Sequence, residues 1–565
     1  MRLEAVDWAI VAAYLLFALG VGVVLARRAG KGMEEYFLSG RSLPWWLAGT
    51  SMAATSFASD TPLAVTEMVR THGVAGNWFW WTYAFGGMMS VFLFARFWRR
   101  ARVVTDAEVT EIRYSGRSAA ALRAFRGIYF STVKNCLVMG WVILAMATIV
   151  GALFPGVDKT AAVAISCAVA LSYAVMGGFW GVVITDFAQF ALALAGAAAA
   201  GWFGWRAIGG LDGLTAALGP EKTAALLEPL PGFGESWLPG SAFVLYLTML
   251  WWCSDSADGG GISVQRMSAS KDEREAVRAC LWYQVMHYGV RTWPWVLVAL
   301  ASLVLFPEMT DHKAAYPETA FLVLPPVWRG ILVASLLAAF MSTIDTHLNW
   351  GASYMVNDLY RRFVNPGASE KRLVAVSRVA TVLLMGLASL VALQYKTITG
   401  AWILTISLGA GAGLVYILRW FWWRINAWSE ISAMTASFAA NAALRAWAPQ
   451  IEFPYTLPWI VGISALVWVP VTFLTPPASE ERLRAFCDRV RPLGRWGPYR
   501  RERSDDSLLR WIVLWLGATA VLYAFLFGGG FLILGRPAFG AALLAGAASG
   551  GVLIFRTLHR ESWSE

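Results

Sequence analysis

The stretch of residues 336–349, which reads LLAAFMSTIDTHLN, places small oxygen-bearing side chains inside an otherwise apolar helix. At 3.6 residues per turn, four positions share one stripe of that helix: Ala339, Ser342, Thr343 and Thr346. Asp345 lies beside Ser342, and hydroxyl and carboxylate oxygens suit an alkali cation better than zinc or copper. The stripe alone leaves open whether it binds a cation or only returns hydrogen bonds to its own helix.

A second stretch, residues 58–62, offers backbone oxygens to the same kind of ion. Pro62 has no N–H, so in a continuous helix the carbonyl of Ala58 would lose its hydrogen bond. Inside hydrocarbon that carbonyl needs another partner, and a cation would serve. A proline kink closed by a neighbouring hydroxyl is the alternative, and Asp60 beside the break favours a functional site.

Residues 251–261 combine Asp255 and Asp258 with three consecutive glycines, a composition that a continuous membrane helix does not tolerate. The second and seventh expected spans are therefore both interrupted. Five spans fall within residues 44–205 and five within residues 241–423. Interrupted helices in corresponding positions predict a transporter built from inverted repeats, with its site at the breaks.

Three further charged residues fall inside expected spans, where charge is costly. Asp186 lies near the start of the sixth span, at its cytoplasmic end. It would be either a charge favourable to the helix dipole or a partner of the 342–346 stripe. Arg291 would pair with an aspartate of the 251–261 segment or with an anionic group of a solute. Lys134 either extends to the membrane surface or lines a cavity.

The composition excludes a soluble globular protein, because 58% of the 565 residues are hydrophobic and only 15% are charged. About fifteen apolar stretches have spanning or near-spanning length, which predicts an all-α polytopic membrane protein. The net charge of +10 does not indicate nucleic acid, because the basic residues lie in loops between spans.

Most of the 46 Lys and Arg residues fall in alternate loops. These loops are residues 27–43, 96–126, 265–278, 357–378, 419–424, 474–510 and 556–560. By the positive-inside rule they face the cytoplasm, which puts the N-terminus outside and the C-terminus inside the plasma (inner) membrane. The first span, residues 6–26, reads as an uncleaved signal anchor.

Enzymatic chemistry has little support in the sequence. The five cysteines are scattered, and the five histidines are equally dispersed. No zinc spacing, disulfide framework or nucleophile–base pair is visible, so we expect neither an enzyme nor a transition-metal site. A membrane-embedded sensor is disfavoured because no soluble domain follows Arg556.

Several motifs together identify a resemblance over about residues 6–475. They are YFLSGR at residues 36–41, Asp186 with Gln189, Gln265 with Arg266, and MSTIDTHLN from Met341. With these motifs the chain resembles the sodium:solute symporter family, which includes sodium-coupled glucose, proline and sialic acid transporters. The resemblance implies a LeuT-type five-plus-five inverted repeat. Its expected parts are an extra N-terminal helix and linker (1–43), two five-helix repeats (44–206 and 241–424), an external loop (207–240), and additional C-terminal helices (425–565) with a basic loop at 474–510.

The family's main sodium site resembles a set of oxygens in this chain. The set comprises backbone carbonyls of Ala58, Thr61 and Ala339 and the hydroxyls of Ser342 and Thr343. A second sodium site, present in some members, would fall on Asp186, Ser342, Asp345 and Thr346. Asp60 matches a position whose carboxylate matters in proline-transporting members.

The resemblance therefore implies a sodium-coupled symporter that imports a small polar organic solute, in contact with membrane lipid and not with nucleic acid. Protein partners are not indicated. Ala64 and Val65 stand where sugar transporters carry a Glu-Gln pair, which leaves the solute open. Arg291 together with Asp60, Asp255 and Asp258 favours an amino acid or organic acid over a sugar. The candidate solute or coupling residues are Asp60, Lys134, Asp255, Asp258 and Arg291. A sensor and a proton-coupled transporter of the same fold are the alternatives.

Overall fold

A computed structural model describes residues 3–29, 31–154, 156–231, 238–395, 397–499, 507–561 and 563. The described chain is helical, with two isolated β-bridges. In chain order the α-helices are α1 (Ala5–Ala29), α2 (Met33–Leu38), α3 (Trp45–Thr55), α4 (Asp60–His72), α5 (Trp78–Trp81), α6 (Tyr83–Met89), α7 (Ala95–Ala101), α8 (Val109–Arg113), α9 (Gly116–Ile128), α10 (Asn135–Leu153), α11 (Lys159–Ala207), α12 (Gly210–Leu218), α13 (Pro220–Leu227), α14 (Gly240–Leu245), α15 (Ile262–Ala269), α16 (Glu273–Gln284), α17 (Thr292–Leu305), α18 (Ala315–Val323), α19 (Trp328–Ser353), α20 (Glu370–Gln394), α21 (Ile398–Gly409), α22 (Gly413–Leu418), α23 (Ala427–Trp447), α24 (Thr456–Leu474), α25 (Glu480–Val490), α26 (Leu508–Ile533) and α27 (Pro537–His559).

Shorter helical segments join several of these helices. The π-helical segments are Ser90–Phe94, Tyr129–Lys134, Tyr246–Leu250, Val285–Val290 and Tyr354–Val364. The 3₁₀ segments are Ser39–Arg41, Val74–Asn77, Asp106–Glu108, Ala410–Ala412 and Gly497–Tyr499.

Among the described residues, 10 helices are long and apolar enough to cross a membrane. We expected about fifteen spans from apolar length. Part of the difference arises where a span is divided: α3 and α4 are separated by a break, and the apolar helix at Gly240–Leu250 ends before α15. Another expected span, Lys159–Ser172, is a shorter apolar helix within α11.

The first interruption lies where we expected it, between α3 and α4 at residues 56–59. Its cause differs from our expectation, however. Pro62 is the third residue of α4, within the first turn, where a missing N–H breaks no helical hydrogen bond. The carbonyl of Ala58 accepts a hydrogen bond from the N–H of Thr61 at 3.2 Å, so Pro62 does not free it.

The second interruption is also confirmed. The helix that begins as α14 continues through a π-helical segment to Leu250, and α15 begins at Ile262. The intervening chain uses Gly259 and Gly261 with φ of +76° and +81°, a conformation that side chains with a Cβ rarely adopt. The glycine run is therefore needed for the path of the chain between the two half-helices.

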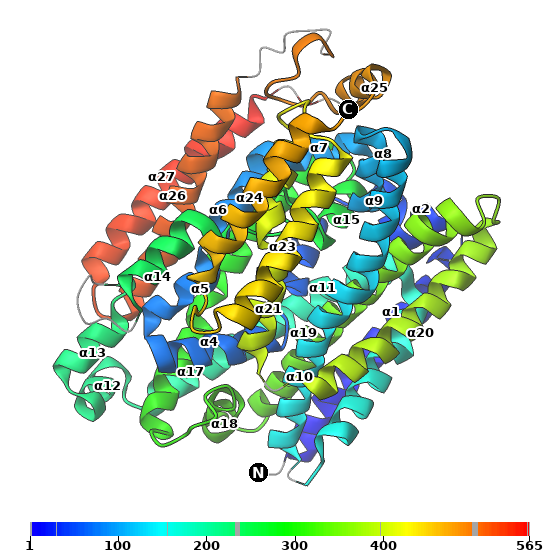
Figure 1. The fold of residues 1–565 in the computed structure, drawn as a ribbon. Helices are drawn as coiled ribbons and strands as arrows, with labels where there is room; N and C mark the ends of the chain where they lie inside the picture. Colours follow the sequence, from blue (N-terminus) through cyan, green and yellow to red (C-terminus); the bar gives the residue numbers. More distant parts are fainter. Residues whose placement is uncertain are drawn as a thin grey trace.

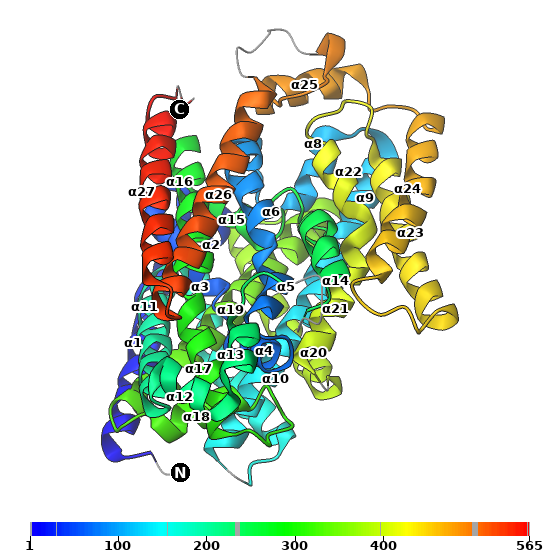
Figure 2. The same ribbon diagram turned by 90° about the vertical axis from the view of Figure 1, so that its left-hand side faces the viewer.

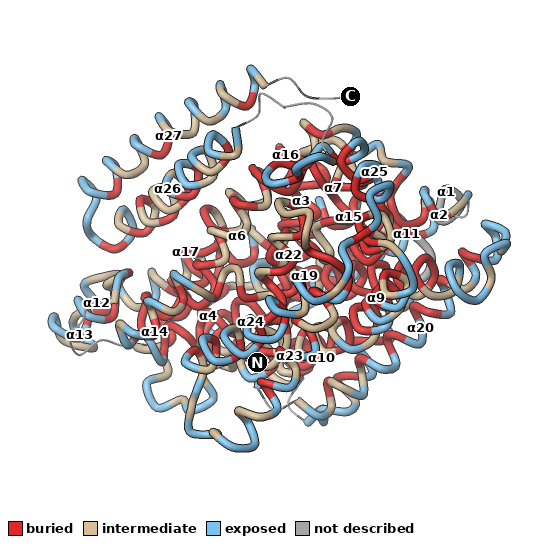
Figure 3. The backbone as a smooth tube through the Cα atoms, turned by 45° about the horizontal axis from the view of Figure 1, so that its top comes forward, coloured by how far each residue is buried: buried red, intermediate tan, exposed pale blue. Residues whose placement is uncertain are grey.

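Helix α19, which carries the 342–346 stripe, lies in the centre of the bundle (Figures 1 and 3). In the most apolar window of Trp328–Val364, 94% of the residues are buried, against 11% for α27 at the flank. Helix α11 consists of two helical segments that meet at Gly178, where φ of +55° and ψ of −164° depart from helical values. It packs along α19 and also contacts α1 and α3. This packing places the carboxylate of Asp186 next to the hydroxyls of α19.

The helices at the two chain ends begin and finish on opposite sides of the bundle: α1 starts at one end and α27 stops at the other (Figure 2). This agrees with an odd number of crossings. Helix α25 lies within the basic connection at 474–510, at the same end of the bundle as the C-terminal end of α27 (Figure 2). Residues 500–506 of that connection lie outside the described residues.

Candidate functional site

The hydroxyl stripe of α19 faces the end of α3. The Thr343 Oγ1 hydroxyl lies 2.9 Å from the carbonyl oxygen of Thr55 and 3.1 Å from that of Ala339. Thr55 is the last residue of α3, where the carbonyls point out of the helix and carry the negative end of its dipole. The carbonyl end of α3 and the hydroxyl stripe of α19 therefore meet at this contact.

Asp186 of α11 closes this region from a third side. Its two carboxylate oxygens accept hydrogen bonds from the hydroxyls of Ser51 and Ser342, each at 2.5 Å. Asp186 is fully buried, and burial of a carboxylate without compensating charge is costly. A positive charge nearby would offset that cost.

Arg266 of α15 supplies that charge. Its Nη2 group donates to the hydroxyls of Thr346 at 2.6 Å and Thr55 at 3.1 Å, and lies 3.6 Å from the nearer oxygen of Asp186. Its Nε group donates to the hydroxyl of Ser51 at 3.2 Å. We call the following residues the hydroxyl cluster: Ser51, Thr55, Asp186, Arg266, Ser342, Thr343 and Thr346.

Of the expected sodium ligands, the Ala339 carbonyl and the Thr343 hydroxyl meet at the contact with α3, and the Ser342 hydroxyl donates to Asp186. The Ala58 carbonyl, in the break just after α3, accepts a hydrogen bond from the N–H of Thr61, and the sodium site as a whole stays a prediction. Of the expected second site, Asp186, Ser342 and Thr346 converge on the hydroxyl cluster, and Asp345 is buried on the same helix.

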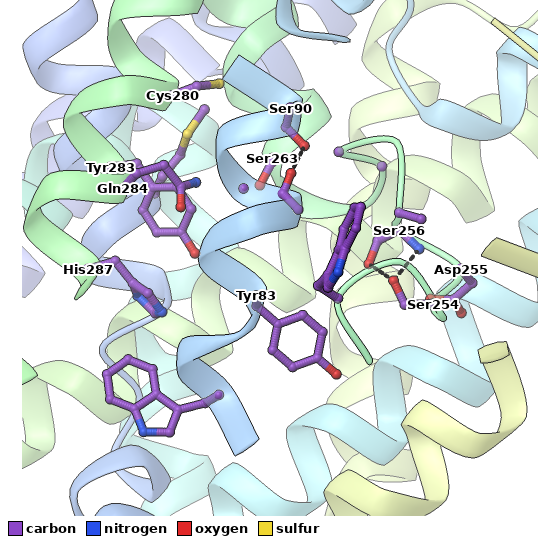
Figure 4. Close-up of a pocket in the computed structure, with 18 of the residues that line it drawn as sticks. Tyr83, Ser90, Ser254, Asp255, Ser256, Ser263, Cys280, Tyr283, Gln284 and His287 are labelled. Atoms are coloured by element: carbon purple, nitrogen blue, oxygen red, sulfur yellow. Dashed lines mark hydrogen bonds between the residues drawn. The ribbon is translucent and has the colours of Figure 1, made fainter. Parts of the chain in front are cut away.

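A cavity of about 390 Å³ lies between the second interruption and helices α6 and α16. Figure 4 shows Tyr83 on one wall, Tyr283 and Gln284 on another, and the loop from Ser254 to Ser256 opposite them. The aromatic side chains at this cavity are Trp80, Tyr83, Trp251, Tyr283 and Tyr288. Its small hydroxyl groups are Ser90, Ser254, Ser256, Ser263 and Thr405.

The charged residues of the cavity are already paired. The Lys134 ammonium forms an ion pair with Asp255 Oδ1. The other oxygen of Asp255 and the Oε1 atom of Gln284 are buried and accept no hydrogen bond from the described residues. The residues that line the cavity therefore carry hydroxyl groups and two unpartnered acceptor oxygens. The ammonium of Lys134 is not free, because Asp255 pairs with it.

Asp60 and Arg291 lie outside the lining of this cavity. Asp60 accepts a hydrogen bond from the indole of Trp402 at 3.1 Å. Arg291 donates to the carbonyls of Ala53 at 3.1 Å and His287 at 3.2 Å, contacts the His287 ring, and forms no ion pair with a described residue. Our expectation that it would pair with an aspartate of the second break is therefore wrong, because its donors are used by the carbonyl of Ala53 near the end of α3 and by His287 in the segment Val285–Val290.

Asp258, the second aspartate of that break, belongs to a separate ionic cluster. Arg419 donates to it at 2.6 Å and to Glu430 at 3.2 Å. Arg126 also pairs with Glu430, at 3.1 Å, and lies 3.5 Å from Asp106. We call these five residues the ionic cluster.

Sequence reasoning missed Ser51 and Thr55 and gave Arg266 no role. A signal was present, because Ser51 and Thr55 are spaced i, i+4 like Ser342 and Thr346 on the facing helix. Among the described residues, no group of three or more His, Cys, Asp or Glu side chains is placed to hold a metal ion.

This arrangement defines a membrane transporter with two interrupted helices around a central helix. The sodium:solute symporter family model matches residues 36–436, and the chain belongs to that family. Its members are sodium-coupled transporters and not enzymes.

Two relatives illustrate the similarity. The chain is 26% identical to sodium/glucose cotransporter 4 of Danio rerio, over 75% of this chain and 69% of that protein. It is 26% identical to sodium/myo-inositol cotransporter 2 of Oryctolagus cuniculus, over 75% of this chain and 67% of that one.

A solved structure of a Na⁺-coupled sialic acid symporter in a substrate-bound, outward-open state superposes with a TM-score of 0.68. The two chains are 20% identical, and the match covers 84% of this chain and 99% of the other. This likeness shows the LeuT-type fold and confirms the expected fold class.

Proposed function

We propose that this protein is a sodium-coupled symporter that imports a neutral, hydroxyl-rich small solute such as a sugar or cyclitol. The observation that carries the solute class is the cavity chemistry. Lys134 is neutralised by Asp255, while the second oxygen of Asp255 and the Oε1 atom of Gln284 have no hydrogen-bond partner among the described residues. A solute with several hydroxyl donors would satisfy these acceptors, and aromatic walls suit its less polar faces.

This proposal replaces the sequence-based preference for an amino acid or organic acid. It depended on Arg291, and the guanidinium of Arg291 is held by the carbonyls of Ala53 and His287 instead of facing the cavity. The relatives of this chain include glucose, mannose and myo-inositol cotransporters, which supports a neutral polyol.

Sodium would bind where Ser342 and Thr343 meet the carbonyl end of α3. The oxygens proposed to hold it are the hydroxyls of Ser342 and Thr343 and the carbonyls of Ala339 and Thr55. A hard cation would replace the hydrogen bonds that these groups now make with one another. By bridging α3 and α19, sodium would favour the outward-facing state as far as its affinity differs between states.

The test is a thermal-shift screen of the purified protein in sodium chloride and in choline chloride. D-glucose, D-mannose and myo-inositol represent neutral polyols, and L-proline and sialic acid represent carboxylate-bearing solutes. We expect polyols to raise the melting temperature in sodium only, because a ligand that binds only the folded state stabilises it. Stabilisation by carboxylate-bearing solutes alone would contradict the proposed solute class.

A matched pair of variants connects the result to the cavity. Gln284→Met keeps the side-chain volume but removes the acceptor, so the polyol-induced shift should disappear. Gln394→Met makes the same change at an exposed position at the end of α20 and should leave the shift intact. Uptake of the stabilising solute into proteoliposomes, driven by an inward sodium gradient, then tests transport itself.

A further inference from the structure

The Arg266 guanidinium lies among the oxygens that the family resemblance assigns to a second sodium ion. Its Nη2 group is 2.6 Å from the Thr346 hydroxyl and 3.6 Å from Asp186. The oxygens of Asp186 are otherwise occupied by the hydroxyls of Ser51 and Ser342. Three of the four expected ligands are therefore already turned toward a positive charge or toward each other.

The physical chemistry of this side chain makes it a permanent occupant. A guanidinium stays protonated at any physiological pH and presents several donors in one plane. Arg266 is 1% exposed, and its guanidinium also lies over the ring of Phe179 at 4.9 Å. A sodium ion at the same carboxylate would meet a like charge a few ångströms away in a poorly screened environment.

We propose that Arg266 is a tethered cation that takes the place of a second sodium ion, so that the protein carries one sodium ion per solute. This inference rests on the proposed sodium coupling. The single ion binds at Ser342 and Thr343, and the carboxylate of Asp186 serves to hold Arg266. Because Arg266 belongs to α15, it also connects the second interrupted helix to α3, α11 and α19.

The number of sodium ions coupled to each solute sets how far the protein can accumulate that solute. With a tenfold sodium gradient and no membrane potential, one coupled ion allows about a tenfold accumulation of a neutral solute, and two ions allow about a hundredfold. The inference therefore describes a transporter of modest concentrating power.

The experiment counts sodium ions by equilibrium binding of ²²Na⁺ to the purified full-length protein. We expect about one ion per wild-type chain, and about one for Asp186→Asn. Arg266→Gln removes the tethered charge and frees Asp186, so its count should rise to about two. Arg123→Gln, which removes the partner of the buried Asp358 elsewhere in the fold, is the control and should bind one ion.

Two results overturn the inference: two ions bound by the wild type, or loss of the bound ion in Asp186→Asn. A count of one in Arg266→Gln that elutes as a folded monodisperse species also overturns it. If Arg266→Gln does not fold, Asp186→Asn/Arg266→Gln removes both charges, and retention of one ion supports the proposal whereas two ions contradict it. A wild-type count of zero refutes sodium coupling itself, and both proposals with it.

Discussion

Arg266 and Arg419 are both 1% exposed, yet their environments differ. Arg266 belongs to the second interrupted helix, and Arg419 lies against the break of that helix. Arg419 makes direct ion pairs, at 2.6 Å to Asp258 and 3.2 Å to Glu430. Arg266 lies 3.6 Å from its carboxylate, and its shorter contacts are with hydroxyl groups. One arginine is held by charge and the other mainly by neutral oxygens.

This difference determines how each region responds when the helices move. A buried, directly paired arginine leaves an uncompensated carboxylate if the pair separates, so the ionic cluster resists separation. Hydroxyl groups rotate and exchange partners at lower cost, so the hydroxyl cluster tolerates the arrival and departure of an ion. The ionic cluster therefore stabilises one arrangement of the second break relative to α9 and α23, and the hydroxyl cluster permits change.

The largest expected effect comes from Arg419→Met in the ionic cluster. Asp258 would lose its arginine while remaining buried, which costs about 3–5 kcal/mol of stability. Thermal unfolding of the purified protein measures this loss. Arg419→Met/Asp258→Asn, which removes both charges, should recover a substantial part of it.

The response of the melting temperature to sodium distinguishes the two clusters. Sodium should raise the melting temperature of Arg266→Gln more than that of the wild type, because the freed Asp186 gains a cation. The melting temperature of Arg419→Met should rise no more than that of the wild type. Equal sodium effects in all three proteins would show that the clusters do not differ as proposed.

The second expected effect concerns the sodium ligands of α19. Ser342→Ala/Thr343→Ala removes two proposed ligand oxygens and should raise the sodium concentration for half-maximal uptake at least tenfold, equivalent to about 1.4 kcal/mol. The measurement is the sodium dependence of solute uptake into proteoliposomes. Unchanged sodium dependence would exclude this location for the ion.

The third effect concerns selectivity in the cavity. Asp255→Asn removes the negative partner of Lys134 and leaves its ammonium exposed to the solute. We expect about a tenfold loss of affinity for a neutral polyol and a gain for its carboxylate analogue, because a buried cation attracts an anionic group. Competition between D-glucose and D-gluconate measures the switch, and equal inhibition by both in this variant would argue against it.

Sequence patterns predicted the second interruption and the polar stripe of α19 because each has a local cause. Gly259 and Gly261 are needed where φ becomes positive, and the polar stripe of α19 follows from helical spacing alone. The exact end of α3 had no such signal. Pro62 is tolerated in the first turn of a helix as well as at a kink, so it did not show that the break precedes Asp60.

The charge partners were the least predictable part of the site. Arg291 forms no ion pair with a described residue. Its partners are the backbone carbonyls of Ala53 and His287. Which arginine reaches which carboxylate depends on the packing of helices far apart in the chain, and Arg266 reaches Asp186 only because α15 packs against α3 and α19. The family resemblance gave the expected sodium ligands but did not indicate that Arg266 lies among them.

The smallest expected effect is that of Asp60→Asn, at the first interruption. The asparagine oxygen still accepts the hydrogen bond of the Trp402 indole, which lies 3.1 Å from the carboxylate. Asp60 does not contact the hydroxyl cluster or line the cavity, so we expect less than about a threefold change in the sodium concentration for half-maximal uptake, below roughly 1 kcal/mol. Asp60→Ala, which removes the acceptor, should lower stability more than it changes sodium dependence. Loss of sodium dependence in Asp60→Asn would instead make this carboxylate a coupling group and would move ion recognition from the hydroxyl cluster to the first break.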